Sequence, residues 1–377
     1  MKIRAHFWQV LLIAVFLACL LTGCHKKQGK LLPLIEGDKP IYVCGGDDSG
    51  RYYKSIWRYI VDKSGKVYLW DNIAPDHIDI YDENGLFLRQ IGSRGQGPGE
   101  FQAITAGAVD SRGDIWINEW NQPKLKVFSN LGEYRKDIKI PEQVECPYIN
   151  EMVIDDHKLY IMGSAARGEI SIYKYDIMED RWEQIYKQEK RIQVSFVLFI
   201  PDMALDEEGN LYITDSFDYR VYQYTKEGKL QVVYENKKAK KEPITDKEFN
   251  VFDDDFKIIR LPEYKAILKQ LTGNSRYFPI IFGINIDGGK IFIWTSERDN
   301  IGRYIVDIFD RRFNKIGRTS YFNFIRDNFA RIFGGKLYIP SIENYQVELV
   351  KNLGRLGLTN VPENLNVYKI SREILQR

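Results

Sequence analysis

Cysteine and histidine are scarce in this sequence, and their scarcity limits the chemistry that the chain can support. Each occurs four times in 377 residues. Four scattered cysteines are not the dense framework of a small disulfide scaffold. Cys44 and Cys146 lie in the main part of the chain, where they either pair or remain as two buried thiols. A histidine-rich zinc site is not expected there, because His77 and His157 alone cannot supply its ligands.

An excess of charge of either sign is also missing. The chain holds 54 basic and 52 acidic residues, and loss of Lys2 and Arg4 with the leader described below leaves 52 of each. A protein that binds nucleic acid through its phosphates carries a basic excess or a basic stripe. Nucleic acid is therefore not expected as a partner.

Long hydrophobic runs are absent, apart from one near the N-terminus. Residues 7–21 are apolar and follow Lys2 and Arg4. The run is too short to span a bilayer comfortably and has the length of the apolar core of a secretory signal. We therefore predict a signal peptide over 1–23. An uncleaved anchor helix is the alternative, which the length of the run disfavours.

The run ends in Leu21-Thr22-Gly23-Cys24, which resembles the lipobox of bacterial lipoproteins. The resemblance implies that the Cys24 thiol is acylated and that the mature chain begins there. Two or three acyl chains suffice for stable membrane anchoring. His25 in place of an aspartate implies the outer membrane in a cell with two membranes. We expect a tether over 24–38 and a lipid-anchored location in the cell envelope.

The rest of the chain repeats one pattern of short strands and turns. Residues 57–91 and 104–138 are the clearest copies, with Asp62-Lys63-Ser64-Gly65 at the position of Asp110-Ser111-Arg112-Gly113. Each Asp-x-x-Gly predicts a hairpin turn, because aspartate bonds back to the backbone and glycine supplies a positive φ. The strand that follows the turn carries an aromatic anchor in each copy, and the anchors are Tyr68, Trp116, Tyr160, Tyr212, Phe292 and Tyr338.

Successive anchors are separated by 48, 44, 52, 80 and 46 residues. Four short strands at a period near these values are typical of a β-propeller blade, so six anchors predict an all-β, six-bladed β-propeller over 39–377. A β-sandwich is the alternative, but it does not repeat its turn chemistry at a fixed period. The last copy ends with 366–370 as its third strand, and 40–43 can supply the fourth. Such pairing would close the ring and remove its exposed edges.

The separation of 80 residues indicates an insertion over 237–276, between the fourth and fifth copies. Thr245-Asp246-Lys247-Glu248 is a capping box followed by phenylalanines at helical spacing, and Pro262 can open a second helix that ends near Gly273. We therefore expect a helical insertion between blades four and five. The basic run 237–241 is interpreted as a solvated linker.

Residues 92–101 read GSRGQGPGEF and lie between the first two copies. This segment resembles the connection between blades in six-bladed propellers with NHL repeats. Together with the lipobox, it makes the chain similar to propeller lipoproteins of the Bacteroidetes. The resemblance implies a fold and a location more than an activity. A phosphate-binding loop is the other interpretation, but the Gly-Lys-Ser/Thr ending is missing.

Two classes of function are compatible with the sequence. The first is a non-catalytic binding or scaffold protein for a protein or saccharide ligand, and the second is a metal-dependent propeller hydrolase, lactonase or lyase. We assign no catalytic residues, no metal ligands and no cofactor, although carboxylates in a propeller channel can hold a divalent metal such as calcium. The scarcity of catalytic residue types favours the binding protein, and the fold alone does not decide, because propellers host both classes.

Ligand recognition is expected on one face of the ring. The connections between blades and the loops between second and third strands lie on the same face, because neighbouring strands run antiparallel. An exposed aromatic residue such as Trp120 is typical of a recognition surface, although it could instead pack against a neighbouring loop. The candidate ligand-binding residues on this face are Arg94, Trp120, Asn121, Arg167, Asp215 and Arg298.

Replacing the lipobox cysteine tests the anchor. Cys24→Ala should prevent lipidation, because the thiol is the attachment point, and should leave a soluble chain or an unprocessed precursor. Membrane association after a carbonate wash is the measurement, with Cys44→Ala as the control that keeps the lipobox intact. Equal retention of Cys24→Ala and the wild-type chain in the membrane fraction would refute lipid anchoring.

Overall fold

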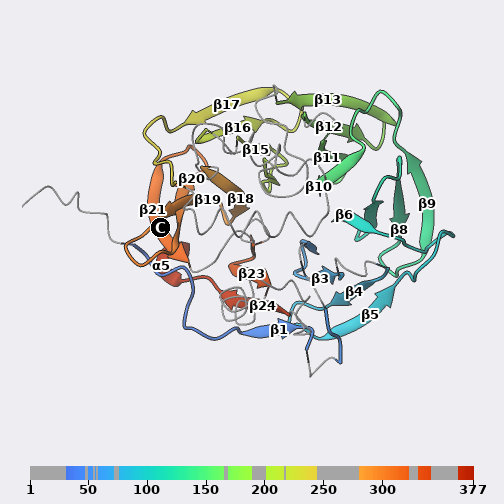
Figure 1. Cartoon of the computed structure of the whole chain (residues 1–377), viewed down its shortest axis with the longest axis horizontal. Coiled ribbons are helices and arrows are strands. Elements are labelled where there is room, and N and C mark those ends of the chain that lie inside the picture. The colour runs from blue at the N-terminus through green and yellow to red at the C-terminus, as the bar shows by residue number, and fades with distance from the viewer. Residues whose placement is uncertain are drawn as a thin grey trace, which may run out of the picture.

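The computed structural model describes residues 31–46, 50–53, 56, 58–71, 76–164, 169–188, 201–215, 218–243, 280–321, 330–340 and 364–377. Within them the chain forms six four-stranded antiparallel sheets around a central channel (Figure 1). The six-bladed propeller predicted from the repeat period is thereby confirmed. Over these ranges, no helix is long and apolar enough to cross a membrane.

Blades one to three take their strands in sequence order, with the first strand of each blade at the channel and the fourth at the periphery (Figure 1). These strands are β2 (Tyr59–Val61), β3 (Val67–Leu69), β4 (Ile78–Tyr81) and β5 (Phe87–Ile91); β6 (Ile104–Val109), β7 (Ile115–Glu119), β8 (Lys124–Phe128) and β9 (Tyr134–Lys139); and β10 (Tyr148–Ile154), β11 (Lys158–Ser164), β12 (Ile170–Asp176) and β13 (Arg181–Lys187).

Blades four and five follow the same order, whereas blade six takes its outer strand from the other end of the chain. The strands are β14 (Met203–Leu205), β15 (Leu211–Asp215), β16 (Arg220–Tyr224) and β17 (Leu230–Glu235); β18 (Ile281–Asp287), β19 (Lys290–Arg298), β20 (Tyr304–Asp310) and β21 (Lys315–Tyr321); and β22 (Arg331–Phe333), β23 (Lys336–Pro340), β24 (Leu365–Lys369) and β1 (Tyr42–Cys44).

The N-terminal strand closes the ring, as predicted. β1 pairs antiparallel with β24, with Tyr42 opposite Val367 and Cys44 opposite Leu365. The third strand of blade six also lies where the sequence placed it. Because the two ends of the chain share one sheet, blade six does not leave the edge of β24 unpaired.

Part of the segment expected as a tether packs against the propeller. Leu32 and Leu34 are buried in the core between blades five and six. Leu32 forms a parallel bridge to Thr319, and Ile35 forms an antiparallel bridge to Ile370. The packed part of the chain therefore reaches back to Leu32. The expected signal peptide and lipidation site lie outside the described residues.

A partly buried hydrogen bond joins the first turn of blade one to its aromatic anchor. Asp62 Oδ1 accepts the backbone N–H groups of Ser64 at 2.8 Å and Lys66 at 3.0 Å, which fixes the turn. Asp62 Oδ2 accepts from the hydroxyl of Tyr68 at 3.1 Å. Gly65 supplies the left-handed residue of the turn, with φ of 86°. One carboxylate therefore fixes both the turn and the anchor.

Two other blades repeat this arrangement. The indole N–H of Trp116 donates to Asp110 Oδ2 at 3.4 Å, and the hydroxyl of Tyr212 donates to Asp206 Oδ2 at 3.3 Å. All six anchors lie on the second strand of their blade and are at most 3% exposed. Each anchor belongs to a hydrophobic core that is shared by two neighbouring blades.

The helical insertion expected between blades four and five is not shown. Residues 244–279 lie outside the described residues, and the preceding 237–243 contain no helix. The one helix in the described ranges is α5 (Arg372–Leu375), which Ser371 caps by accepting from the N–H of Glu373.

Cys44 and Cys146 are two separate buried thiols. Cys44 lies in the core between blades six and one, and Cys146 lies in the core between blades two and three. Burial raises the pKa of each thiol to about 12. Both are therefore protonated at neutral pH, and they are structural rather than nucleophilic.

The turn–anchor bond predicts a difference between two similar aspartates. Asp62→Ala should lower the free energy of unfolding by about 1–3 kcal/mol more than Asp82→Ala, because it removes the acceptor for a buried hydroxyl as well as the turn contacts. Asp82 is the matched control, since it fixes an outer hairpin turn through the N–H groups of Asn84 and Leu86 alone. Urea unfolding measures both values. Equal losses would show that the anchor hydroxyl contributes nothing.

Candidate functional site

Three of the six candidate ligand-binding residues lie together on the face that carries the connections between blades, here called the loop face. Arg94 forms a parallel bridge to Phe101, and the N–H of Trp120 donates to the carbonyl of Ala103 at 2.8 Å. The connection between blades one and two therefore runs beside the loop of Trp120 and Asn121. Arg94, Trp120 and Asn121 are all exposed.

Trp120 is both packed and exposed. Its ring centroid lies 4.9 Å from that of Tyr148, at an interplanar angle of 39°. Despite this contact, Trp120 remains 44% exposed. Asn121 has φ of 54°, a left-handed conformation that asparagine adopts more readily than most residues. These contacts hold an apolar surface at the junction of blades two and three. Arg94, Trp120, Asn121 and Tyr148 are called the aromatic patch below.

The other three candidates do not join this patch. Arg167 lies outside the described residues. Asp215 is 4% exposed and accepts the N–H of Asp218 at 3.4 Å. Arg298 stacks on the ring of Tyr304 at 5.1 Å and donates to its hydroxyl at 3.2 Å. Its strand, β19, lies in blade five, across the ring from blade two (Figure 1).

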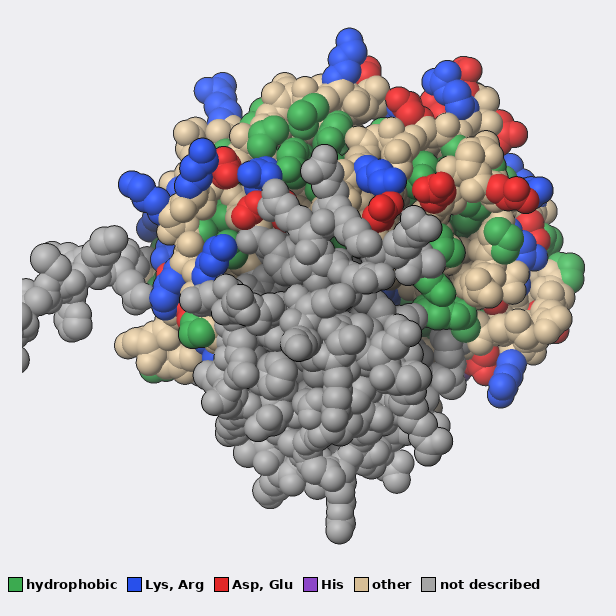
Figure 2. All heavy atoms as spheres, turned by 45° about the horizontal axis from the view of Figure 1, so that its top comes forward, with side chains coloured by type: hydrophobic (Ala, Val, Ile, Leu, Met, Phe, Trp, Pro, Cys, Tyr) green, Lys and Arg blue, Asp and Glu red, His purple; other side chains and the backbone are tan. Residues whose placement is uncertain are grey.

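Charges of both signs are mixed on the surface. Figure 2 shows basic and acidic side chains interspersed with apolar ones over the described surface that faces the viewer. This distribution agrees with the balanced composition of the chain. In the part of the surface described and visible there, no single sign of charge dominates a broad region.

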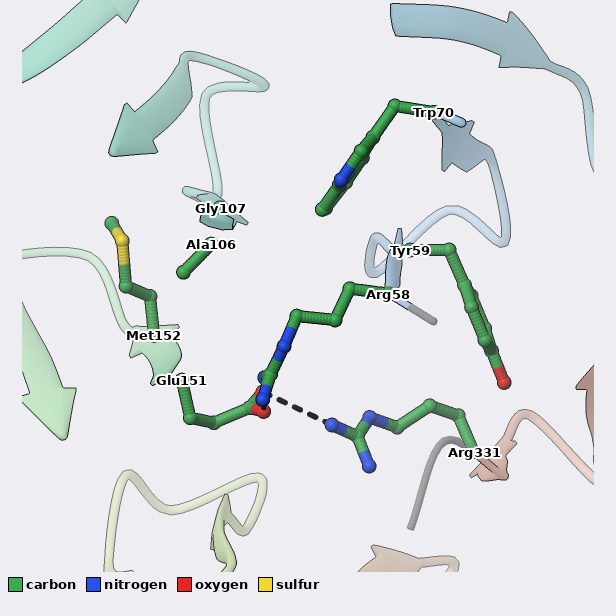
Figure 3. Close-up of a pocket in the computed structure, with 8 residues that line it drawn as sticks. All are labelled: Arg58, Tyr59, Trp70, Ala106, Gly107, Glu151, Met152 and Arg331. Atoms are coloured by element: carbon green, nitrogen blue, oxygen red, sulfur yellow. Dashed lines mark hydrogen bonds and ion pairs between the residues drawn. The ribbon is translucent and has the colours of Figure 1, made fainter. Parts of the chain in front are cut away.

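A cluster of charged side chains crosses the channel, and the sequence analysis missed it. Glu151 of β10 accepts hydrogen bonds from Arg58 at 2.6 Å and from Arg331 of β22 at 3.0 Å. The two guanidinium groups approach the carboxylate from different sides (Figure 3). Each carboxylate oxygen of Glu151 accepts from a different arginine. These charge-assisted bonds tie blades one, three and six together across the channel.

Asp202 extends this channel cluster to blade four. Its Oδ2 lies 3.8 Å from Nη1 of Arg331 and accepts the N–H of Ile284 at 2.9 Å, while Oδ1 accepts the N–H of Met203 at 2.9 Å. Burial raises the pKa of Asp202 to about 6, with Arg331 opposing this shift and Glu151 reinforcing it.

The carboxylates act on Arg331 in return. Burial disfavours the charged guanidinium, but Glu151 and Asp202 outweigh that effect and hold the pKa of Arg331 above its ordinary value. Arg331 therefore carries a positive charge inside the channel at all physiological pH values.

Alignment of the copies by their aromatic anchors contains a signal for this cluster. In each blade, one residue of the first strand pairs with the anchor, and five of these six residues are uncharged. Arg331 is the charged member of the set, which consists of Ile60, Ala108, Val153, Ala204, Asn285 and Arg331.

A cavity of about 220 Å³ lies along the channel. It extends from Glu151 and Arg331 to Asp62 and Lys63, which belong to the first hairpin turn. The cavity therefore reaches the face that carries the hairpin turns, here called the turn face, which is opposite the loop face. A smaller hollow of about 10 Å³ adjoins the cluster, and Trp70 lines it.

Metal binding has no assignable site in the described part of the chain. Among those residues, no three or more His, Cys, Asp or Glu side chains are grouped so that they could hold a metal ion. Glu151 and Asp202 face Arg331 instead. The calcium considered in the sequence analysis stays an untested alternative.

Comparison with known protein families agrees with this architecture. The profile of the DUF5128 family, described as a 6-bladed beta-propeller, matches residues 55–256, which is more than half of the chain. The chain belongs to this family. No curated protein matches it in sequence.

Solved structures share the fold at low sequence identity. A DUF4221 family member from Bacteroides vulgatus is 16% identical, with a TM-score of 0.57 over 92% of this chain and 99% of its own. A Bacteroides fragilis protein whose name describes it as exported is 12% identical, with a TM-score of 0.48 over 87% and 94%. Virginiamycin B lyase from Staphylococcus aureus is 11% identical, with a TM-score of 0.43 over 83% and 80%. The first likeness supports the fold, and none of the three assigns an activity to this chain.

The position of Asp202 predicts a specific dependence of stability on pH. Its pKa is about 6 in the folded chain and 3.8 ordinarily, so the folded state retains a proton that the unfolded state releases between about pH 4 and 6. The contribution of Asp202 to stability should therefore fall as pH rises through this window. Urea unfolding of the wild type and Asp202→Asn at successive pH values measures it, because the substitution removes this carboxyl group and leaves the carboxylates outside the channel unchanged. A constant difference between the two proteins would contradict the raised pKa.

Proposed function

We propose that this propeller is a lipid-anchored, non-catalytic binding protein of the cell envelope, and that it recognises a protein or saccharide ligand through the aromatic patch. The observation that carries the proposal is the exposed ring of Trp120, held in place by Tyr148. A rigid aromatic surface of this kind gives a large contact area at a low cost in conformational entropy.

The neighbours of Trp120 support recognition of a polar partner. Arg94 offers a guanidinium, and Asn121 offers an amide that can both donate and accept hydrogen bonds. Both are exposed and lie on loops that backbone hydrogen bonds join. An apolar centre with a polar rim is the arrangement found at protein interfaces.

The proposed location rests on the N-terminal sequence. The apolar run 7–21 and the lipobox cysteine Cys24 support export and lipidation, and His25 favours the outer membrane. The membrane is then a partner through the lipid, and neither nucleic acid nor a cofactor is part of the proposal. Likeness to NHL-repeat propellers of the Bacteroidetes is in keeping with such a protein.

The state of the channel carboxylates favours binding over catalysis. Both oxygens of Glu151 accept from guanidinium groups, and both oxygens of Asp202 accept from backbone N–H groups. A general base must reach a substrate proton at hydrogen-bond distance. A substrate proton at either carboxylate would have to compete with these contacts, two of which come from guanidinium groups.

Capture experiments with one substitution test the aromatic patch. The mature chain, produced without its lipid, should retain a protein or polysaccharide from an envelope extract, and Trp120→Ala should weaken that binding by about thirtyfold or more, because aromatic hot spots contribute at least about 2 kcal/mol. Leu131→Ala is the control, since Leu131 is an exposed apolar residue on the turn face. Equal capture by the wild type and Trp120→Ala would refute the patch.

Metal analysis of the same purified chain distinguishes the proposed binding protein from a metal-dependent enzyme. A binding protein of the proposed kind should contain no stoichiometric divalent metal and should capture its ligand equally well after chelation. One tightly bound divalent metal per chain, together with hydrolysis or elimination that a chelator abolishes, would favour the hydrolase, lactonase or lyase instead.

A further inference from the structure

Exposed apolar side chains recur at one position of the turn face. In each of blades one to four, the hairpin turn between the third and fourth strands carries one large apolar residue at its tip or at its end. These residues are Leu86, Leu131, Met178 and Leu230, and each is between 52% and 73% exposed. Hairpin turns are ordinarily polar, so an apolar residue at the same place in four consecutive blades requires a reason.

Blade six adds two exposed apolar residues to this face. Leu375 of α5 lies beside Gly335, in the turn between the first two strands of the blade. Ile41 immediately precedes β1, which begins at the turn face because it runs antiparallel to the third strand, β24. The four turn residues, Leu375 and Ile41 are called the apolar rim below.

The N-terminal segment enters the propeller from the side of the turn face. Leu32 pairs in parallel with Thr319, and its N–H donates to the carbonyl of Arg318 at 2.8 Å. The strand that holds both partners, β21, begins after the turn that ends at Asn314 on the turn face and runs toward the loop face. Paired parallel chains run in the same direction, so the chain reaches Leu32 from the turn-face side.

The short distance in sequence between the predicted lipid and this entry point limits where the bilayer can lie. Cys24 and Leu31 are seven positions apart, which an extended chain spans with at most about 25 Å. A lipid on Cys24 therefore holds the bilayer close to the side of the propeller that carries the apolar rim.

Charge does not explain this surface. The turns of the apolar rim hold both signs, with Glu179 and Arg181 near Met178, and with Lys226 and Glu227 shortly before Leu230. Such a surface gives little net attraction to anionic lipid, whereas apolar side chains enter the boundary between headgroups and acyl chains. Contact with a bilayer should therefore depend on apolar area rather than on lipid charge.

We propose that the turn face lies on the bilayer surface, with the side chains of the apolar rim inserted among the lipid headgroups. The inference rests on the lipid anchor of the proposed function, because a few separate side chains bind a bilayer weakly without one. In this orientation the loop face points away from the membrane, and a ligand can reach Trp120.

Two similar turns on opposite faces provide a matched test of the orientation. Ser129-Asn130-Leu131-Gly132 lies on the turn face, and Asp299-Asn300-Ile301-Gly302 lies on the loop face between β19 and β20. In both, the glycine N–H donates to the carbonyl of the first residue. Leu131 and Ile301 are 60% and 58% exposed. Leu131→Trp and Ile301→Trp therefore place the same fluorescent reporter on the two faces.

The mature chain of each variant is coupled through Cys24 to a maleimide lipid in phosphatidylcholine vesicles. Cys44 and Cys146 are buried, which directs the coupling to Cys24. Acyl chains brominated near the headgroup quench tryptophan only at short range. After subtraction of the emission of the unsubstituted chain, Leu131→Trp should lose most of its signal and Ile301→Trp should retain it.

Removal of apolar side chains tests whether the rim holds the face on the bilayer. With Leu86→Trp as the reporter, Leu131→Ser together with Met178→Ser should lower the ratio of docked to undocked chains by about tenfold or more, because less apolar surface leaves water. Ile301→Ser is the control and should leave the ratio unchanged. Addition of anionic phosphatidylglycerol should also change it little.

Three quenching results would overturn the proposal: equal quenching of the two reporters, quenching of Ile301→Trp alone, and quenching of neither. A chain that sediments as a dimer, and that Leu131→Ser converts to a monomer, would assign the rim to a second copy instead. Circular dichroism verifies that each variant is folded. Because the coupling is chemical, failure of lipidation in the cell appears only in the carbonate wash of Cys24→Ala, and failure of ligand recognition appears only with Trp120→Ala.

Discussion

The pairing of β1 with β24 is the constraint on which the rest of the molecule depends. Blades one to five are each built from consecutive strands, so local contacts can form them one at a time. Blade six cannot be completed until residues 325 positions apart in the sequence meet, as Tyr42 and Val367 do. The loss of chain entropy in that step is offset when the remaining edge strand is covered and the core between blades six and one becomes buried.

Ring closure also creates the channel cluster. Arg58 precedes the first strand of blade one, Arg331 begins the first strand of blade six, and Glu151 lies in blade three. These residues can meet only when all the blades are in the ring. Removing Glu151 alone would leave two partly buried guanidinium groups facing each other with one carboxylate fewer between them, which is destabilising. The cluster therefore forms only in the correctly assembled ring, and it also lines the cavity.

Much of the architecture was predictable because the residues that define each blade lie close together in the sequence. A turn aspartate, a glycine with positive φ and an aromatic residue at a fixed distance are all visible in one copy, and Asp62, Gly65 and Tyr68 make the contacts that their types suggest. The closing strand could also be predicted, because the last copy lacked one strand and the N-terminal region had one unassigned.

The candidate site was harder to predict, because it depends on which residues of different blades meet. No local pattern distinguishes Glu151 from the many other carboxylates of the chain, and its partners are 93 and 180 residues away. The packing of Leu32 and Leu34 against the propeller is not indicated by the sequence either, because so short an apolar stretch has no periodicity. Trp120, by contrast, lies on an exposed loop as the sequence predicts. Its contact with Tyr148 was not predictable, because Tyr148 belongs to the next blade.

The packing of Leu32 has a mechanical consequence for a protein held by its N-terminus. If Cys24 is fixed in a membrane, the seven residues before Leu31 extend at most about 25 Å, so the propeller can move only a short distance from the bilayer. Any force along this connection is first applied to Leu32, which is buried against Gly317 and bridged to Thr319. Only after that contact fails would tension reach β1 and open the ring. In a chain anchored in this way, the buried leucines would bear the tension before the closing strand does.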